Sequence, residues 1–153
     1  MATFLGPGAN APLAADEAVV MWRAGKSGPA HSLAVLPAPH GPQPWLPLQE
    51  PPPPYAVASP GGHEYRLRLA DMPMSVETIY LVLYTSSAQT LMPLGSVAVH
   101  VGGYDMVMEQ ADLSVPSMVV AELYRRNGQW KVRAKKDGVF DGIGELAKRL
   151  GVR

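Results

Sequence analysis

The segment Met118–Ala134 constrains the fold more than any other part of the chain, because it reads as a nearly complete β-hairpin. Asn127 and Gly128 supply the two positive-φ positions of a type I′ turn, which is the strongest short-range signal for a hairpin. A two-residue turn here places charged side chains across from each other on one face and apolar side chains on the other. The expected pairs are Arg126 with Gln129, Tyr124 with Lys131 and Glu122 with Arg133, and the expected apolar face holds Val119, Ala121, Leu123, Trp130, Val132 and Ala134.

Strand-like alternation recurs along the rest of the chain. In His63–Leu69, the side chains of Tyr65, Leu67 and Leu69 share one face, with charged residues between them. Further strands are expected at Glu17–Trp22, His31–Leu36, Thr78–Tyr84, Ser96–Val101 and Tyr104–Gln110. Many short strands separated by turn residues predict an all-β protein, a β-sandwich of two antiparallel sheets.

Two segments depart from this pattern. Residues 37–60 hold ten prolines, and because proline donates no ladder hydrogen bond, we expect a long surface loop that is partly polyproline II. Residues 138–151 are predicted to hold a C-terminal helix, with Asp137 as its N-cap and Gly151 as the C′ residue that terminates it. Its expected apolar stripe holds Phe140, Ile143, Leu146, Ala147 and Leu150.

The composition narrows the class of protein. A chain of 153 residues is expected to form one domain, 1–153. It contains no cysteine, which excludes disulfides, thiolate metal sites and a thiol nucleophile. No apolar run approaches the roughly 18 residues of a membrane span, and the start does not resemble a signal peptide. We therefore expect a cytoplasmic protein without a membrane span.

Charge is unevenly distributed although the net charge is zero. Residues 122–153 hold nine Lys or Arg against four acidic residues, and the earlier residues hold four against nine. The candidate interaction surface on the basic hairpin consists of Arg126, Lys131, Arg133 and Lys135. Such a face contacts acidic partners or simply faces solvent, whereas a nucleic-acid-binding domain is usually basic as a whole.

A second candidate for interaction lies in the proline-rich segment. Pro52, Pro53, Pro54 and Tyr55 match the PPxY pattern that aromatic grooves bind in a polyproline conformation. A stiff surface loop is the simpler interpretation, and an exposed docking arm for a protein partner is the alternative.

The sequence offers little for catalysis or metal binding. It has no GxSxG, P-loop, GxGxxG or paired-carboxylate motif, so we expect a protein that is not an enzyme. The weak metal candidates are an acidic cluster of Asp105, Glu109 and Asp112, and the histidines His31 and His63. The eight methionines suit a packed core and loops without a metal.

Four runs carry a resemblance to a known family: GANAPL at residues 8–13, YRLRLADMP at 65–73, ELYRRNGQWKVRA at 122–134 and DGVFDGIGELAKRLGV at 137–152. They resemble the TerD-domain family of bacterial tellurium-resistance and stress proteins, and are closer to its divergent TerA-like branch. The resemblance covers essentially the whole chain and implies a β-sandwich with short helices.

The resemblance also implies calcium sites, built from alternating aspartates in an early strand and an acidic pair before a later one. This chain has Ala30, Ser32 and Ala34 at the first place, and Gly61–Gly62 followed by His63 at the second. Calcium takes six to eight oxygen ligands, many of them carboxylates. We therefore expect these calcium sites to be lost, and no cofactor to be bound.

The expected function is that of a non-catalytic stress or tellurite-resistance protein of the TerD type, acting as an interaction or structural subunit. Its partners would be other proteins of the same resistance system, and a homo-oligomer is compatible with the sequence. One alternative is a protein that binds calcium or another metal at a rebuilt site. The other is a binder of nucleic acid or anionic surfaces through the basic hairpin face.

Overall fold

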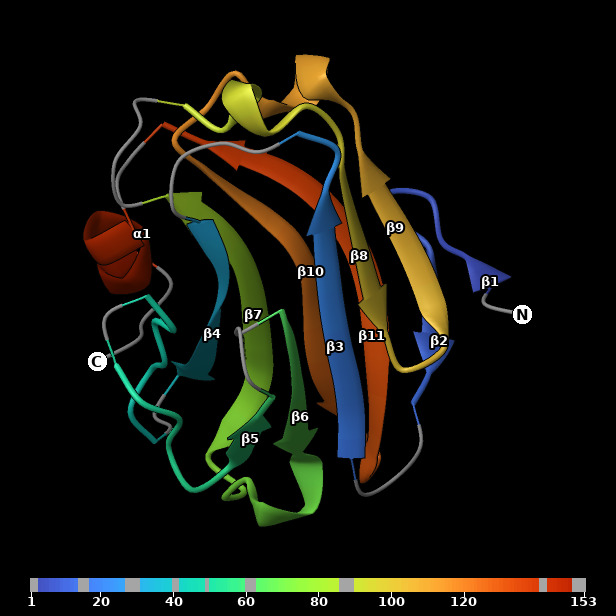
Figure 1. Ribbon diagram of the computed structural model, residues 1–153. Coiled ribbons are helices and arrows are strands. Elements are labelled where there is room, and N and C mark those ends of the chain that lie inside the picture. Colours follow the sequence, from blue (N-terminus) through green and yellow to red (C-terminus); the bar gives the residue numbers. More distant parts are fainter. Residues whose placement is uncertain are drawn as a thin grey trace.

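The structure, a computed structural model, describes residues 3–13, 17–26, 31–39, 42–48, 50–59, 63–85, 90–140 and 143–149. Two sheets pack face to face as a β-sandwich (Figure 1), which confirms the predicted fold class. The six-stranded sheet has the order β1-β9-β8-β3-β6-β5, and the five-stranded sheet has the order β2-β11-β10-β7-β4. All pairs are antiparallel except β1 with β9.

The strands of the six-stranded sheet are β1 (Thr3–Phe4), β3 (Glu17–Ala24), β5 (Ala56–Ala58), β6 (Glu64–Arg68), β8 (Val97–Val101) and β9 (Tyr104–Met108). Those of the five-stranded sheet are β2 (Asn10–Pro12), β4 (His31–Pro39), β7 (Val76–Thr85), β10 (Ser117–Arg126) and β11 (Gln129–Val139). Short 3-10 helices lie at Leu69–Asp71, Met92–Leu94 and Gln110–Leu113. Every strand expected from alternation is present, and β1, β2 and β5 are additions that are too short to show a period.

The hairpin of β10 and β11 has the predicted turn and the predicted register. Asn127 and Gly128 have φ values of 52° and 78°, as a type I′ turn requires. Arg126 pairs with Gln129, Tyr124 with Lys131, and Glu122 with Arg133. Turn chemistry and side-chain pattern therefore determine this part of the fold together.

One residue of the predicted apolar face lies on the opposite side. The register of β10 shifts between Val119 and Ala121, which marks a β-bulge. A bulge adds one residue to the strand and reverses the facing of the residues before it. Val120 therefore belongs to the main core, and Val119 packs in a second apolar cluster on the outer face of the sheet.

Both ends of the proline-rich segment form strands where a loop was predicted. β4 continues through Pro37 to Pro39, and β5 lies at Ala56–Ala58. The prediction was wrong at these residues because β4 is the edge strand of its sheet. On the outer side of an edge strand there is no neighbouring strand to accept a hydrogen bond, so the N–H that proline lacks is not needed there. The segment is also anchored, since the backbones of Trp45 and Val35 exchange two hydrogen bonds of 2.9 Å.

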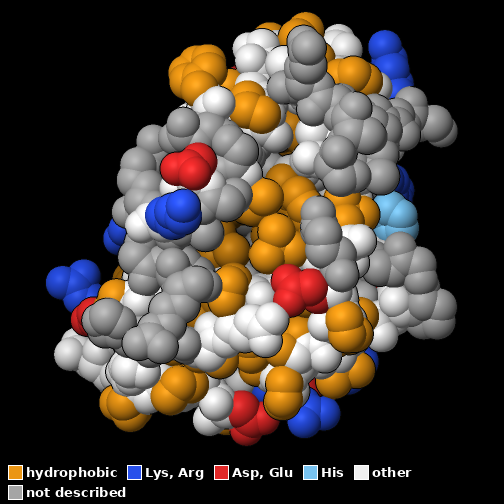
Figure 2. All heavy atoms as spheres, turned by 90° about the vertical axis from the view of Figure 1, so that its left-hand side faces the viewer, with side chains coloured by type: hydrophobic (Ala, Val, Ile, Leu, Met, Phe, Trp, Pro, Cys, Tyr) orange, Lys and Arg blue, Asp and Glu red, His pale blue; other side chains and the backbone are white. Residues whose placement is uncertain are grey.

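This anchored segment lies along one flank of the sandwich. Trp45 is buried, its ring lies 4.9 Å from that of Tyr65, and its indole Nε1 donates to the carbonyl of Glu50 at 3.2 Å. Figure 2 views the molecule from this side and shows hydrophobic side chains gathered along it. Trp45 therefore anchors the proline-rich segment to the sandwich.

The C-terminal helix is shorter than predicted and begins later. β11 runs to Val139, so Asp137 belongs to a strand and is not an N-cap. The helix α1 spans Ile143–Arg149, and the residues expected after its end lie outside the described part of the chain. Phe140 is exposed instead of starting an apolar stripe. The glycine-rich run before α1 has low helix propensity, which fits the late start.

Helix α1 lies beside β4 at one side of the sandwich (Figure 1) and packs on the outer face of the five-stranded sheet. Leu146 is buried and Ile143 half-buried there. They pack in the second apolar cluster, whose other members are Ala34, Leu36, Ala38, Leu46, Tyr80, Val82, Tyr84, Val119 and Val139. The β4 and β7 half of this face is thereby covered, while β10 and β11 present their charged residues beside it.

Candidate functional site

The structure brings two of the predicted site residues together. His31 begins β4 and His63 precedes β6, and their ring centroids lie 6.2 Å apart. The ring of Trp22 lies 5.6 Å from that of His63. These three residues line an open pocket of about 700 Å³ together with Arg23, Lys26 and Glu64. We call it the histidine pocket.

Strand pairing explains why these residues meet. β3 and β6 are antiparallel neighbours in a register that places Met21 opposite Glu64, and the Trp22 amide donates to the carbonyl of His63 at 3.1 Å. β4 lies in the other sheet, and the phenol of Tyr65 donates to the Leu33 carbonyl across the sandwich at 3.2 Å. The pocket therefore forms where one end of β3 approaches the start of β4.

Sequence reasoning missed Trp22, Arg23 and Lys26 as pocket residues. The alternation of β3 indicates which of its side chains point inward, but no local pattern shows that its end lies beside His63. The paired residues of β3 and β6 lie 43 to 51 residues apart in the sequence, so the approach is a property of the assembled sandwich.

The residues present do not fit a calcium ion. Ser32 and Ala34 are buried, and Ala34 packs with Leu36 in the second apolar cluster. A hydroxyl and a methyl group cannot replace the carboxylates that calcium requires. Ala30, Gly61 and Gly62 lie outside the described residues. Within the described part of the chain, no three His, Asp or Glu side chains converge as metal ligands would.

The predicted acidic cluster is not assembled. Asp105 lies 2.8 Å from His100. Glu109 and Asp112 instead form a capping box around the 3-10 helix Gln110–Leu113. Asp112 also pairs with Lys136 at 3.3 Å. These carboxylates are thus used by different neighbours.

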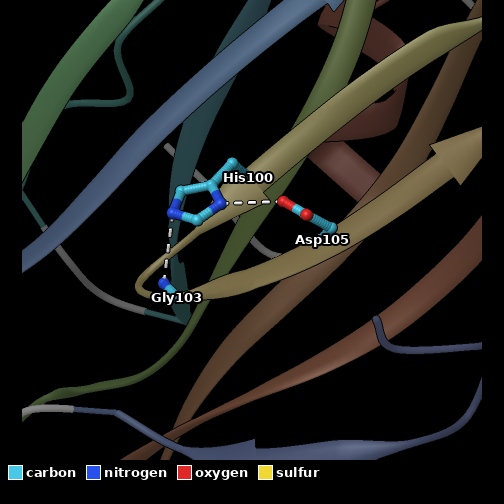
Figure 3. Close-up of polar contacts among 3 residues, drawn as sticks. All are labelled: His100, Gly103 and Asp105. Atoms are coloured by element: carbon cyan, nitrogen blue, oxygen red, sulfur yellow. Dashed lines mark hydrogen bonds and ion pairs between the residues drawn. The ribbon is translucent and has the colours of Figure 1, made fainter. Parts of the chain in front are cut away.

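His100 and Asp105 make a histidine–carboxylate contact in the β8–β9 hairpin (Figure 3). The Gly103 amide donates to His100 Nε2 at 3.3 Å, so the proton of the neutral ring lies on Nδ1, which donates to Asp105. A general base needs a free nitrogen directed at a nucleophile. Both ring nitrogens here are bonded within the hairpin, so the arrangement braces a turn.

The basic hairpin residues lie on one face, as predicted, but several have acidic or aromatic partners. Arg133 pairs with Glu122 at 2.8 Å, and its guanidinium lies 4.6 Å from the centre of the Tyr124 ring. Lys135 lies 3.4 Å from Asp137. Arg126 is exposed and Lys131 is half-buried. The positive charge of this face is therefore partly neutralised within the hairpin.

The PPxY segment is not available as a whole. Pro52 and Pro54 are exposed and Pro53 is half-buried, but Tyr55 is only 4% exposed. Its phenol donates to the carbonyl of Gln43 at 2.7 Å, and burial raises its pKa. A groove that reads this motif must contact the tyrosine ring, so including Tyr55 in an exposed interaction surface was wrong.

The fold and the site define a two-sheet β-sandwich protein with a polar pocket beside the end of β3. The family model of the TerD domain matches residues 63–150 of this chain. Since this match spans more than half of the chain, the protein belongs to the TerD-domain family. The narrower resemblance to the TerA-like branch stays a prediction.

Two solved structures share the fold. One is a protein of unknown function, SAV2460, with a TM-score of 0.64 and 14% sequence identity, over 90% of this chain and 98% of that one. The other is SCO6318 from Streptomyces coelicolor A3(2), a homologue of a telluride resistance protein, with a TM-score of 0.61, 14% identity and the same coverage. At this identity the likeness concerns the fold alone. A comparison with curated proteins gave no match, and the described residues include no helix able to cross a membrane.

Proposed function

We propose that this protein is a non-catalytic, calcium-independent member of the TerD family, acting by contacts with other proteins of a cytoplasmic tellurium-resistance or stress system. The observation that carries the proposal is the row of Lys131, Arg133 and Lys135 along β11, beside the half of the same sheet face that α1 covers. Arg126 extends this row at the turn.

The distribution of charge in this row favours a protein partner. Glu122 and Asp137 lie among the cations and bind two of them, so the face offers a mixed pattern. Mixed charges select a complementary protein surface, whereas nucleic acid requires a largely cationic face. We therefore expect the protein to cause no shift in the mobility of duplex DNA at low salt. A salt-dependent mobility shift that vanishes when the charges of Arg126, Lys131, Arg133 and Lys135 are reversed would favour the nucleic-acid alternative.

Calcium independence is tested by calorimetry on chelator-stripped protein. We expect no saturable heat on titration with calcium chloride, because the early strand carries Ser32 and Ala34 where carboxylates would be needed. Thermal unfolding should be the same with and without millimolar calcium. Binding in the micromolar range would contradict the proposal and favour a rebuilt metal site.

The interaction surface is tested with two matched charge reversals. Arg126→Glu with Lys131→Glu alters the basic hairpin, and Arg66→Glu with Arg68→Glu reverses the same number of charges on exposed residues of the other sheet. In the producing cell, some proteins should cross-link to the wild type. We expect the same proteins to cross-link to the Arg66→Glu/Arg68→Glu variant but not to the Arg126→Glu/Lys131→Glu variant. Loss with both variants, or with neither, would contradict this assignment.

A further inference from the structure

The histidine pocket is lined mainly by hydrogen-bond donors and by few carboxylates. Arg23, Lys26 and His63 line it, and Glu64 is the one carboxylate among the described lining residues. His31 lies next to His63 and adds a second imidazole. The described lining of this pocket thus carries more hydrogen-bond donors than acceptors, which suits an anion better than a cation.

Trp22 provides an independent observation. Its side chain is 5% exposed and lines the pocket, and its buried indole Nε1–H has no hydrogen-bond acceptor among the residues that the structure describes. Buried donors are nearly always bonded, and an unpaired one needs an explanation. An indole N–H can only donate, so the missing partner must be an acceptor, such as an oxygen atom.

We propose that the histidine pocket binds a small oxyanion, with Lys26 supplying charge and His63 and Trp22 supplying N–H donors. Charge-assisted hydrogen bonds to an oxyanion are stronger than neutral ones. Glu64 also lines the pocket, and its negative charge disfavours highly charged anions. This site lies apart from the basic hairpin, and so it goes beyond the proposed protein contacts and does not depend on them.

Inorganic phosphate is the probe. Calorimetry at constant ionic strength should give saturable binding to the wild type, and Lys26→Glu should weaken it by about tenfold or more, the effect of one charge-assisted hydrogen bond. His63→Gln keeps an N–H donor and should bind within a few-fold of the wild type, whereas His63→Asp should not bind. Lys131→Glu reverses a charge on the other sheet and is the matched control, with unchanged binding expected.

Tryptophan fluorescence provides a second readout. The chain has three tryptophans, and Trp22 lines this pocket, so phosphate should change the emission of the wild type but not that of Trp22→Phe. If Trp22→Phe does not fold, the Lys26 and His63 variants still decide the matter by calorimetry. Absence of saturable phosphate binding would overturn the proposal. Equal weakening by Lys26→Glu and Lys131→Glu would overturn it too, because it would indicate general attraction.

Discussion

Replacement of Trp45 by alanine is expected to lower the free energy of unfolding by about 3–5 kcal/mol, the usual cost of removing a large buried aromatic side chain. The side chain is 2% exposed and packs against Tyr65. Trp45→Ala keeps the backbone hydrogen bonds with Val35, but it also removes the indole hydrogen bond to the Glu50 carbonyl, which helps to hold the proline-rich segment in place. Chemical denaturation followed by circular dichroism measures the change.

Phe140→Ala is the control for this prediction. That ring is 84% exposed, so its removal should change stability by no more than about 0.5 kcal/mol. A segment released by Trp45→Ala should also become sensitive to limited proteolysis between residues 46 and 58. A variant that loses less than about 1 kcal/mol, with unchanged proteolysis, would contradict the role of Trp45 as an anchor.

Stability should also fall steeply in alkali. Burial raises the pKa of Tyr84 from 10.0 to about 12, although the Leu48 amide, which donates to its phenol oxygen at 3.0 Å, acts in the opposite direction. Burial raises the pKa values of Tyr55 and Tyr65 as well. Because the folded state holds these protons more tightly than the unfolded state, stability is complete below pH 10 and decreases as the pH rises from there through the folded-state values.

The contribution of Tyr84 alone is about 2–3 kcal/mol, lost between roughly pH 10 and 12. Urea unfolding at pH 8, 10 and 11.5 measures the decline. Tyr84→Phe removes one of the titrating groups and should show a shallower decline, even though it loses the hydrogen bond to Leu48. A denaturation midpoint that stays constant from pH 8 to 11.5 would contradict the assignment of these phenols as buried acids.

The parts of the fold that were predictable are those determined by neighbours in sequence. The turn at Asn127–Gly128 determines a register, and the alternation in β6 and β9 identifies their buried faces. The bulge before Ala121 was not predictable, because the residue types in the strand do not reveal it. The bulge changes only the face of the sheet to which the preceding side chains point. The prediction at Pro37 and Pro39 failed for a related reason. A proline disrupts a central strand but is tolerated in an edge strand, and the local sequence does not show that β4 lies at an edge.

The candidate site was predictable only in part. That calcium does not bind stays a prediction from the residue types at positions 32 and 34, and His31 and His63 could be named as candidates because they lie near the positions where the family resemblance implies calcium ligands. The contribution of Trp22 and Lys26 depends on how the two sheets approach each other, which strand periods do not encode. Likewise, the PPxY pattern gives no indication that Tyr55 turns inward to bond with Gln43.

The prolines of β4 have a consequence for behaviour at high concentration. An outermost strand normally offers a row of unpaired amides and carbonyls onto which another chain can add, and this addition is a common route to aggregation. Pro37 and Pro39 remove two of the amides from that row, and the backbone of Trp45 occupies the amide and carbonyl of Val35. This side of the molecule should therefore resist growth into fibrils, even in concentrated solution.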